Sequence, residues 1–527
     1  MFGLWWGTLL VSFASSVGAT LAFLLSRYLL RGFVQARFGD RLAALNRGVR
    51  NDGPFYLLTL RLIPVIPFFL INLLMALTPI PARQFYLYSQ LGMLPATLVF
   101  VNAGTQLADI NQLRDVVAPD VLGALALLAL FPLLAKFAAV VIRRRRFRAA
   151  WPPPAAVDRN IIVIGAGSAG LVASLIAATV RAKVTLIEST RMGGDCLNTG
   201  CVPSKALLRV AREVHAARSG GLLGAARNPV EVDFAAVMQR VRDVIAAIAP
   251  HDSVERYTGL GVECIEGRAR VISPWEVEVG TRRFAARAIV LATGARPLVP
   301  PLPGVENSGY LTSDTLWDLT ALPPRLLVLG GGPIGCELAQ AFARLGSAVT
   351  VVEMAERLLP REDAAVGEML GHVFRAEGIT LHLHCRAERF VAATGRKYLE
   401  VSSLALGDAE HFEVEFDEVL LALGRTPNVH GFGLEELGLL DPERGTLEVD
   451  DCLQTRLPSI YACGDVVGPY QFTHVASHQA WYATVNALFG SPLKRFAVDY
   501  RVIPWCTFTD PEVARVGLSE TEAAARG

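Results

Sequence analysis

Two cysteines carry the most distinctive chemistry in the sequence. Cys196 and Cys201 are separated by four residues, and Pro203 and Lys205 follow them closely. Proline suits the first turn of a helix, because it lacks the N–H that would be unsatisfied there. Cys201 is therefore expected at a helix N-terminus, where the helix dipole and the Lys205 charge favour a thiolate. The pattern indicates a disulfide that opens and closes; the alternatives are inert thiols or a zinc half-site, which no second cysteine pair completes.

Two stretches, one before the cysteines and one after them, have the pattern of a dinucleotide-binding βαβ unit. Each contains a buried-strand run, a GxGxxG motif, a helical stretch and a second apolar run that ends in an acid. The motif residues are Gly165, Gly167, Gly170 and Glu188 in the first unit, and Gly330, Gly332, Gly335 and Glu353 in the second. The glycines let the backbone approach a pyrophosphate at a helix N-terminus, and the acid accepts hydrogen bonds from ribose hydroxyls. Because the spacing is the same in both units, we predict two bound dinucleotides.

The cysteine segment 193–205 resembles the active-site segment of the flavoprotein disulfide reductases, the family of dihydrolipoamide dehydrogenase, glutathione reductase and mercuric reductase. Three further motifs follow the order of that family. They are 292–297 with Thr293 and Gly294, 423–428 with Gly424 and Arg425, and 460–465 with Asp465. The resemblance runs from about residue 160 to the end of the sequence.

This resemblance implies an α/β reductase fold with two Rossmann-like domains, the NAD(P)-binding one inserted into the FAD-binding one. It implies FAD and NAD(P)H as cofactors. It makes Cys196 the interchange thiol that meets the substrate, and Cys201 the charge-transfer thiol against the flavin. It also gives Lys205 and Glu337 a joint role near flavin N5, where an ion pair can stabilise negative charge during hydride transfer. The alternative for Glu337 is an ordinary helix carboxylate.

The composition indicates that part of the chain lies in a membrane. Of 527 residues, 52% are hydrophobic, and the mean hydropathy of +0.38 is high for a soluble enzyme. The net charge of +1 gives no indication of nucleic-acid binding. The sequence has eight cysteines, and the six outside the redox pair occur singly along the chain. This distribution is typical of reduced thiols and not of a disulfide framework.

Uncharged or nearly uncharged apolar runs occupy residues 1–26, 62–82, 84–108 and 121–142. Basic segments follow the first run and the last, at 27–50 and 143–148, and the positive-inside rule places both in the cytoplasm. Three crossings cannot return the chain to the same side. The run 62–82, interrupted by four prolines, is therefore predicted to be re-entrant. The acidic connection at 109–120 then lies outside.

The motif 61–68 with Asn72, together with 91–95, resembles the DedA or SNARE-associated Golgi protein family of re-entrant membrane proteins. The resemblance implies lipid or small-solute handling, and a simple membrane anchor is an equal alternative. Arg61, near an apolar core, is either functional or extends to the membrane surface.

These observations predict a multi-domain chain with an α-helical membrane domain followed by the reductase. The predicted boundaries are 1–150 for the membrane domain, 151–159 for a proline-rich linker, 160–297 and 429–498 for the FAD domain, 298–428 for the NAD(P) domain, and 499–527 for the start of a dimerisation domain. The family's C-terminal His and Glu pair is not present in this sequence, so we expect either a truncated domain or an enzyme without that acid and base. A homodimer through this domain is expected.

Two histidine pairs are interpreted as structural, and no metal site is predicted. His382 and His384 alternate on an expected strand without further ligands. His474 and His478 have helical spacing, but no HExxH motif surrounds them.

The leading hypothesis is a multi-pass inner or plasma membrane protein with a cytoplasmic reductase. Electrons pass from the nicotinamide through FAD to Cys196 and Cys201, and on to an unidentified acceptor such as a disulfide or a mercuric ion. The alternative is a transport or lipid-handling protein whose reductase domain senses redox state. Glu353 favours NADH over NADPH, although Arg357 lies close enough in sequence to contact a 2′-phosphate.

Overall fold

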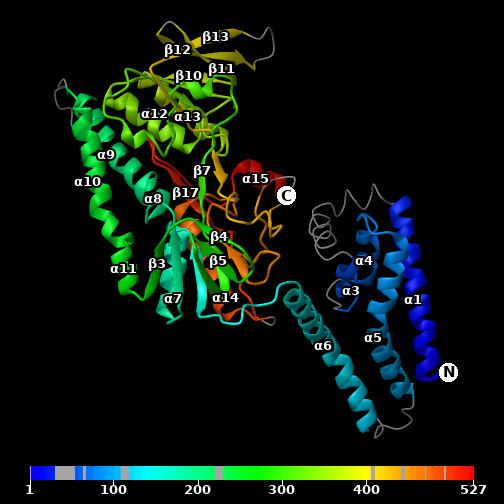
Figure 1. Ribbon diagram of the computed structural model, residues 1–527. Coiled ribbons are helices and arrows are strands. Elements are labelled where there is room, and N and C mark those ends of the chain that lie inside the picture. The colour runs from blue at the N-terminus through cyan, green and yellow to red at the C-terminus, as the bar shows by residue number, and fades with distance from the viewer. Residues whose placement is uncertain are drawn as a thin grey trace. The chain divides into compact units, whose positions relative to one another are not determined.

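The computed structural model describes residues 2–29, 54–62, 67–108, 118–219, 230–393, 395–404, 410–440, 446–468, 470–491 and 494–526 (Figure 1). The chain divides into two compact units, Met1–Pro152 and Pro153–Gly527. Each unit is described by itself.

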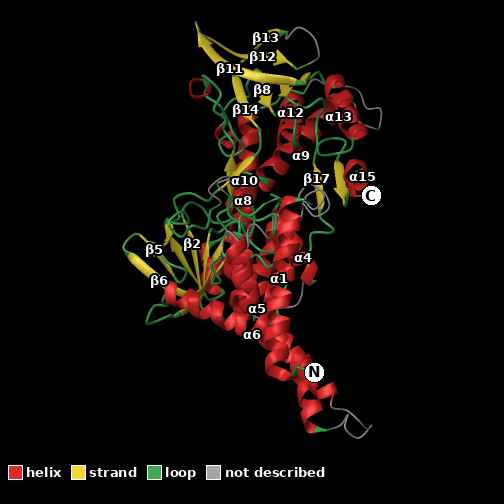
Figure 2. Cartoon of the chain, turned by 90° about the vertical axis from the view of Figure 1, so that its right-hand side faces the viewer, coloured by secondary structure: helices red, strands yellow, loops and turns green. Residues whose placement is uncertain are grey.

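All regular secondary structure in the described residues of the first unit is helical (Figure 2). Its helices are α1 (Gly3–Tyr28), α3 (Pro54–Leu62), α4 (Phe68–Met75), α5 (Ala82–Ala108) and α6 (Pro119–Ala150). By length and composition, α1 and α5 can each cross a membrane. The core lies where α1 meets α4 and α5, and the Phe23 and Phe85 rings stack there with centroids 4.2 Å apart.

The region predicted to be re-entrant contains two short helices in place of a long one. Helices α3 and α4 have nine and eight residues, whereas crossing a bilayer core takes about 20. Residues 63–66 between them, most of the basic segment 27–50 and the acidic residues Asp109 and Asp115 lie outside the described residues. The re-entrant path therefore stays a prediction. Helix α6 carries the last apolar run and the basic segment 143–148 in one helix of 32 residues.

The second unit begins with a seven-stranded sheet that holds the first predicted βαβ unit. Its strands in spatial order are β3 (Val262–Glu266), β2 (Val184–Glu188), β1 (Arg159–Ile164), β6 (Arg282–Leu291), β5 (Glu276–Val279) and β4 (Ala269–Val271), and β16 (Ile460–Ala462) also pairs with β6. The pairs among β3, β2, β1, β6 and β16 are parallel. Strand β1 is buried from Ile161 to Ile164, as expected for a parallel strand covered on both faces.

Four helices of six or more residues surround or follow this sheet before the inserted domain, and another returns to it after that domain. They are α7 (Ser168–Thr179), α9 (Cys201–Ser219), α10 (Phe234–Ile248), α11 (Val254–Gly259) and α14 (Thr473–Phe489). Helices α7 and α14 pack closely through small side chains, with Ala173, Ala177, Ala480 and Ala483 all fully buried. The early and late parts of the FAD-binding sequence thus share one core.

The second βαβ unit forms a separate parallel sheet. Its strand order is β10 (Thr380–Leu383), β9 (Ala348–Glu353), β8 (Arg325–Leu329) and β14 (Glu418–Leu421), and its helices are α12 (Pro333–Leu345) and α13 (Ala364–Ala376). An antiparallel sheet of β11 (Cys385–Ala393), β12 (Arg396–Ser403) and β13 (His411–Phe416) lies at one end of it (Figure 1).

The chain enters and leaves this second domain through adjacent strands. β7 (Ala295–Pro297) and β15 (Arg425–Pro427) pair antiparallel, with Arg425 opposite Pro297. After β15 the chain returns to the first sheet through β16. The domain bounded by these two strands is therefore inserted into the first one.

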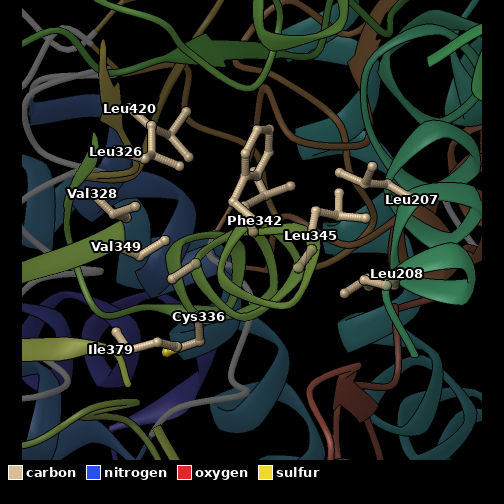
Figure 3. Packing of buried hydrophobic residues seen from close by; sticks show 14 of the residues in the cluster. Leu207, Leu208, Leu326, Val328, Cys336, Phe342, Leu345, Val349, Ile379 and Leu420 are labelled. Carbon is tan, nitrogen blue, oxygen red and sulfur yellow. The ribbon is translucent and has the colours of Figure 1, made fainter. Parts of the chain in front are cut away.

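The helix that follows the redox cysteines is buried against the inserted domain (Figure 3). Leu207 and Leu208 of α9 face Phe342 and Leu345 of α12, and all four side chains are buried. Burial of each such side chain contributes about 1.5 to 3 kcal/mol. The helix that begins at Cys201 is thus packed against the inserted domain.

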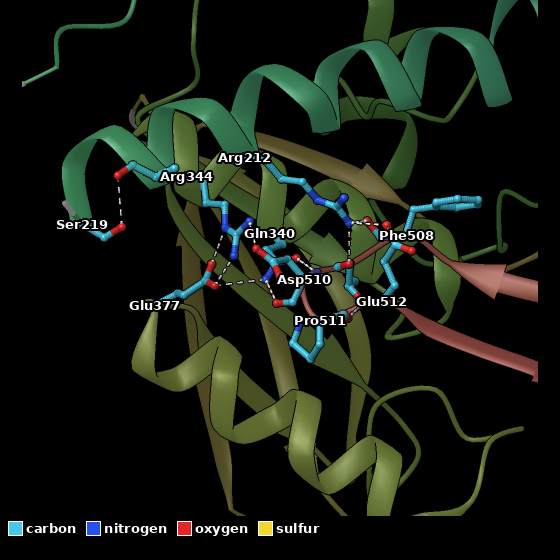
Figure 4. Close-up of polar contacts among 11 residues, drawn as sticks. Arg212, Ser219, Gln340, Arg344, Glu377, Phe508, Asp510, Pro511 and Glu512 are labelled. Atoms are coloured by element: carbon cyan, nitrogen blue, oxygen red, sulfur yellow. Dashed lines mark hydrogen bonds and ion pairs between the residues drawn. The ribbon is translucent and has the colours of Figure 1, made fainter. Parts of the chain in front are cut away.

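The described chain ends in β17 (Pro504–Thr507), β18 (Val513–Val516) and α15 (Glu520–Arg526). Ion pairs fix the segment between the two strands to the inserted domain and to α9 (Figure 4). Arg344 of α12 donates to Glu377 at 2.8 Å and to Asp510 at 2.9 Å, and its side chain is only 4% exposed. Arg212 of α9 donates to Glu512 at 2.9 Å.

We expect Arg344→Met to lower the free energy of unfolding by about 3 kcal/mol, because it leaves the nearly buried Glu377 carboxylate without its cationic partner. The measurement is the thermal unfolding midpoint of the full chain in detergent. Arg389→Met is the matched control, since its pair with Glu400 is largely exposed and should contribute at most about 1 kcal/mol. Equal midpoints for the two variants would contradict the assignment.

Candidate active site

The redox cysteines lie on two consecutive helices beside the first glycine loop. Cys196 is in the short helix α8 (Gly194–Asn198), and Cys201 is the first residue of α9. Both are half-buried free thiols. Gly193 and Gly194 have φ of 89° and 55°, and a Cβ on Gly194 would lie 2.5 Å from the Gly167 Cα. The paired glycines therefore let α8 approach the dinucleotide loop closely.

The surroundings of Cys201 favour its thiolate. The pKa of Cys201 is lowered to about 6. The largest cause is a hydrogen bond from the Cys196 thiol, the Thr473 hydroxyl and the Lys205 charge act in the same direction, and burial opposes them. The Thr473 hydroxyl lies 3.2 Å from the Cys201 sulfur. The same Cys196–Cys201 contact, together with burial, raises the pKa of Cys196. One proton is thus retained by Cys196, and the negative charge resides on Cys201.

Lys205 and Glu337 form an ion pair between α9 and α12. The Lys205 Nζ lies 2.9 Å from Glu337 Oε2, and the Glu337 side chain is 8% exposed. The backbone N–H of Phe508 donates to Glu337 Oε1 at 2.8 Å. The Phe508 ring centroid lies 4.5 Å from Lys205 Nζ. Both dinucleotide domains and the C-terminal segment therefore hold this pair.

The two glycine loops have matching geometry. Gly165 and Gly330 have φ of 101° and 105°, and a Cβ on either would collide with the carbonyl of Ala292 or Ala422. Gly170 and Gly335 show the same restriction, since their added Cβ atoms would lie 1.8 and 1.9 Å from the carbonyl of the first glycine in each loop.

The middle glycines, Gly167 and Gly332, cap the N-termini of α7 and α12. A Cβ on Gly332 would meet nothing within 4 Å, so the loop surface is open in front of this helix. A helix N-terminus behind an open glycine loop fits a pyrophosphate. The residues present therefore fit two dinucleotides.

The terminal acids are also equivalent. Glu188 and Glu353 are the last residues of β2 and β9. Glu188 accepts hydrogen bonds from the Ala166 N–H at 2.6 Å and from the Ser189 and Thr190 N–H groups at 2.9 Å. Glu353 accepts from the Gly331 N–H at 2.5 Å and the Ala355 N–H at 2.7 Å. Since a carboxylate has about four lone-pair sites, Glu353 retains capacity for ribose hydroxyls.

The remaining predicted cofactor residues gather where the domains connect. Thr293 donates to the Asn428 carbonyl at 2.7 Å, and Gly294 accepts from the Asn428 N–H at 2.9 Å. Gly294 and Gly424 have φ of 68° and 114°, which favours glycine at both positions. The structure brings these residues together, and their contact with the flavin stays a prediction.

Arg425 links this junction to the cysteine helix. It forms an ion pair with Asp195, donates to the Ala295 carbonyl at 2.8 Å, and its Nε lies 3.7 Å from Asp465 Oδ2. Burial raises the pKa of Asp465 to about 6, although the Arg425 charge opposes this effect. Burial likewise raises the pKa of Asp195. Arg425 therefore lies between two carboxyl groups that are both partly desolvated.

Three residues at the site were not predicted from the sequence: Thr473, Phe508 and Asp195. Thr473 is 272 residues from Cys201 in the chain, and no local motif connects them. Phe508 reaches Glu337 through its backbone, which carries no sequence signal. Asp195 directly precedes Cys196, and an acid beside a redox cysteine was a signal that could have been used.

The expectation that His382 and His384 alternate on one strand is wrong. His382 lies in β10, but that strand ends at Leu383, and His384 has φ of 55° between β10 and β11. The two histidines therefore do not share one strand. His474 and His478 do lie on one helix, α14. No group of three or more potential metal ligands occurs among the residues that the structure describes.

Comparisons with known proteins agree with this arrangement. Residues 159–480 match the pyridine nucleotide-disulphide oxidoreductase family, and residues 1–106 match the VTT domain. The chain is 34% identical over 370 residues to a mercuric reductase of Bacillus cereus, covering 70% of this chain and 58% of that protein. It is 35% identical over 379 residues to a dihydrolipoyl dehydrogenase of Chlamydia muridarum, covering 70% and 77%.

Among solved structures, the chain is similar to the HOCl-induced flavoprotein disulfide reductase RclA from Escherichia coli. The TM-score is 0.61 at 29% identity, covering 70% of this chain and 79% of that one. The chain spans 58% to 66% of the length of three mercuric reductases that it matches. These matches confirm the predicted fold class and both predicted resemblances. The chain belongs to the pyridine nucleotide-disulphide oxidoreductase family.

Proposed function

We propose that the protein is a membrane-tethered NAD(P)H-dependent flavoprotein oxidoreductase that works through the Cys196–Cys201 disulfide. The observation that carries the proposal is the asymmetry of the two thiols. Cys201, at the start of α9, has a pKa of about 6, whereas the pKa of Cys196 is raised. Two inert thiols would need no such difference.

The two cysteines can together take up both electrons and the proton of a hydride equivalent. A hydride equivalent delivers two electrons and one proton, which convert the disulfide into one thiol and one thiolate. Cys196 holds the proton and Cys201 holds the charge. Bound FAD supplies the two-electron relay between the nicotinamide and this disulfide. Glu337 holds the Lys205 ammonium group near the cysteines, and the Phe508 N–H orients Glu337.

The acceptor is proposed to react at Cys196, which the shorter helix α8 presents. Candidate acceptors are a small disulfide, a mercuric ion or another small molecule. A homodimer through the C-terminal segment, which contains β17 and β18, is part of the proposal.

Steady-state turnover separates an enzyme from a redox sensor. The full chain in detergent with FAD is given excess NADH and one candidate acceptor at a time, and NADH oxidation is followed. An enzyme consumes many equivalents of NADH for each chain with at least one acceptor. Consumption of a single equivalent with every acceptor would support the rival function, a transport or lipid-handling protein that senses redox state.

The charge on Cys201 predicts a pH dependence. Because its pKa is lowered to about 6, the thiolate of the two-electron-reduced protein should be present above pH 6 and protonated as the pH falls through 6. The long-wavelength charge-transfer absorbance, which arises from the Cys201 thiolate against oxidised flavin, should decrease as the thiolate is protonated. Thr473→Val removes a hydrogen bond that lowers this pKa, so the midpoint should move to higher pH, and Thr473→Ser should restore it. An unchanged midpoint in Thr473→Val would contradict the role of Thr473.

The proposed topology places the reductase in the cytoplasm of a multi-pass inner or plasma membrane protein. The segment 143–148 at the end of α6 is strongly basic, and the positive-inside rule favours the cytoplasmic face for it. Reporter fusions after Gly53 and after Pro81 should both report the cytoplasmic face, because α3 and α4 are too short to span. Opposite faces at these two points would overturn the re-entrant path.

A further inference from the structure

Within the described part of the membrane unit, Arg61 is a buried cation without a carboxylate partner. It lies in the last turn of α3 and is 6% exposed. Its Nη2 donates to Asn72 Oδ1 at 2.5 Å and its Nε donates to Ser89 Oγ at 3.2 Å, so both partners are neutral. Its third nitrogen, Nη1, is buried and has no hydrogen-bond partner. Asp120 is the one acidic residue among the described residues of this unit, and it is not a partner of Arg61.

The packing holds this cation inside the helices instead of letting it extend to the surface. The guanidinium carbon lies 5.0 and 5.4 Å from the ring centroids of Phe68 and Phe85. Gly92 of α5 makes the close approach possible, because a Cβ there would lie 2.6 Å from the Arg61 Cβ. A buried charge is costly unless it is paired. The fixed position of Arg61 therefore indicates a negatively charged ligand.

A cavity of about 330 Å³ adjoins Arg61. Its size falls within the range of about 300 to 1,000 Å³ that is usual for small-molecule sites. Apart from Arg61 its walls are mainly apolar, with two hydroxyl groups, and they include Phe68, Ile71, Met93, Phe100, Ser15 and Thr97. One cation in an otherwise apolar cavity fits a ligand with one charged end and an apolar body.

From this geometry we infer that the cavity at Arg61 binds a long-chain carboxylate. Arg61 lines the cavity, its side-chain partners Asn72 and Ser89 are neutral, and one carboxylate charge neutralises the guanidinium. A phosphate monoester brings more negative charge than this site can neutralise. A neutral alcohol would leave the cation unpaired, and a two-chain phosphodiester exceeds the cavity. This inference is independent of the reductase chemistry.

The test measures laurate binding to the full chain in a non-ionic detergent at pH 8, by equilibrium dialysis with radiolabelled laurate. We expect one laurate for each chain. Arg61→Met should weaken binding at least tenfold. Ala96→Phe, which fills the cavity and keeps Arg61, should weaken it to a similar extent. Arg83→Met, at an exposed arginine in the first turn of α5, is the matched control and should bind as the unmodified protein does.

Competition distinguishes the ligand classes. Dodecanol, dodecyl phosphate and a two-chain phosphatidylglycerol should each displace laurate at least tenfold more weakly than unlabelled laurate does. Equal laurate binding by Arg61→Met and the unmodified protein would overturn the inference. So would stronger competition by the alcohol or by either phosphate compound. If Arg61→Met does not fold, Ala96→Phe decides, and unchanged binding in that variant overturns the inference.

Discussion

Cys201→Ser is expected to abolish the long-wavelength absorbance that NADH or dithionite produces in the flavoprotein, and Cys196→Ser should make this absorbance permanent. The first change removes the thiolate that the site stabilises with a pKa of about 6. The second prevents the disulfide from forming, so Cys201 stays reduced. Both variants should lose acceptor turnover by at least about a thousandfold, because each removes one half of the redox pair. Absorbance spectra and NADH-dependent turnover are the measurements.

The scattered cysteines provide the control for this experiment. Cys452 is a half-buried thiol in the FAD-binding part of the chain, and nothing places it in the redox pair. Cys452→Ser should therefore retain both the absorbance and the turnover. If Cys196→Ser and Cys201→Ser both kept the spectrum of the unmodified protein, the redox assignment would be wrong.

The parts of the fold that local rules determine were predictable from the sequence. Glu188 and Glu353 end their strands as the βαβ pattern predicts, because the pattern combines a buried strand, glycine loop and acid within one short stretch. Cys201 begins its helix as Pro203 indicates. The insertion of the second domain was predicted only by resemblance, and the β7–β15 pair shows it directly.

The contacts that tune the site were not predictable, because they depend on tertiary packing. Thr473 reaches Cys201 only through the fold of the FAD domain around its sheet. Phe508 orients Glu337 through a backbone N–H, which every residue except proline possesses. His384 breaks the expected strand with a positive φ that its residue type does not require. Sequence patterns identified the reacting thiols and the Lys205 charge, whereas the contacts of Thr473 and Phe508 came from the structure.

In the membrane unit, too, helices were predictable from the sequence and side-chain contacts were not. The apolar runs predicted helices α1 and α5, and proline patterning indicated that 62–82 is not one continuous helix. The sequence left open whether Arg61 extends to the surface. Its contacts with Asn72 and Ser89 favour a position inside the helices.

NADH should exceed NADPH in kcat/KM by about ten- to hundredfold. Glu353 is held at the second glycine loop by the Gly331 and Ala355 N–H groups, so its carboxylate cannot easily turn away from an incoming 2′-phosphate. An unpaired carboxylate that faces a phosphate in a partly desolvated cleft costs on the order of 1 to 3 kcal/mol. Steady-state kinetics with each coenzyme measure the ratio. Glu353→Ala should narrow it, chiefly by improving the use of NADPH.

Arg357 is the group that opposes this preference. Its Nε is buried without a hydrogen-bond partner, and its Nη2 has only a long contact of 3.5 Å to the Pro360 carbonyl. The guanidinium is therefore not neutralised by Glu353 and remains able to attract a 2′-phosphate. Arg357→Ala should widen the NADH preference, whereas Glu356→Gln, at an exposed carboxylate in the same loop, should leave it unchanged. A preference for NADPH in the unmodified protein would mean that Arg357 outweighs Glu353 and that the role assigned to Glu353 is wrong.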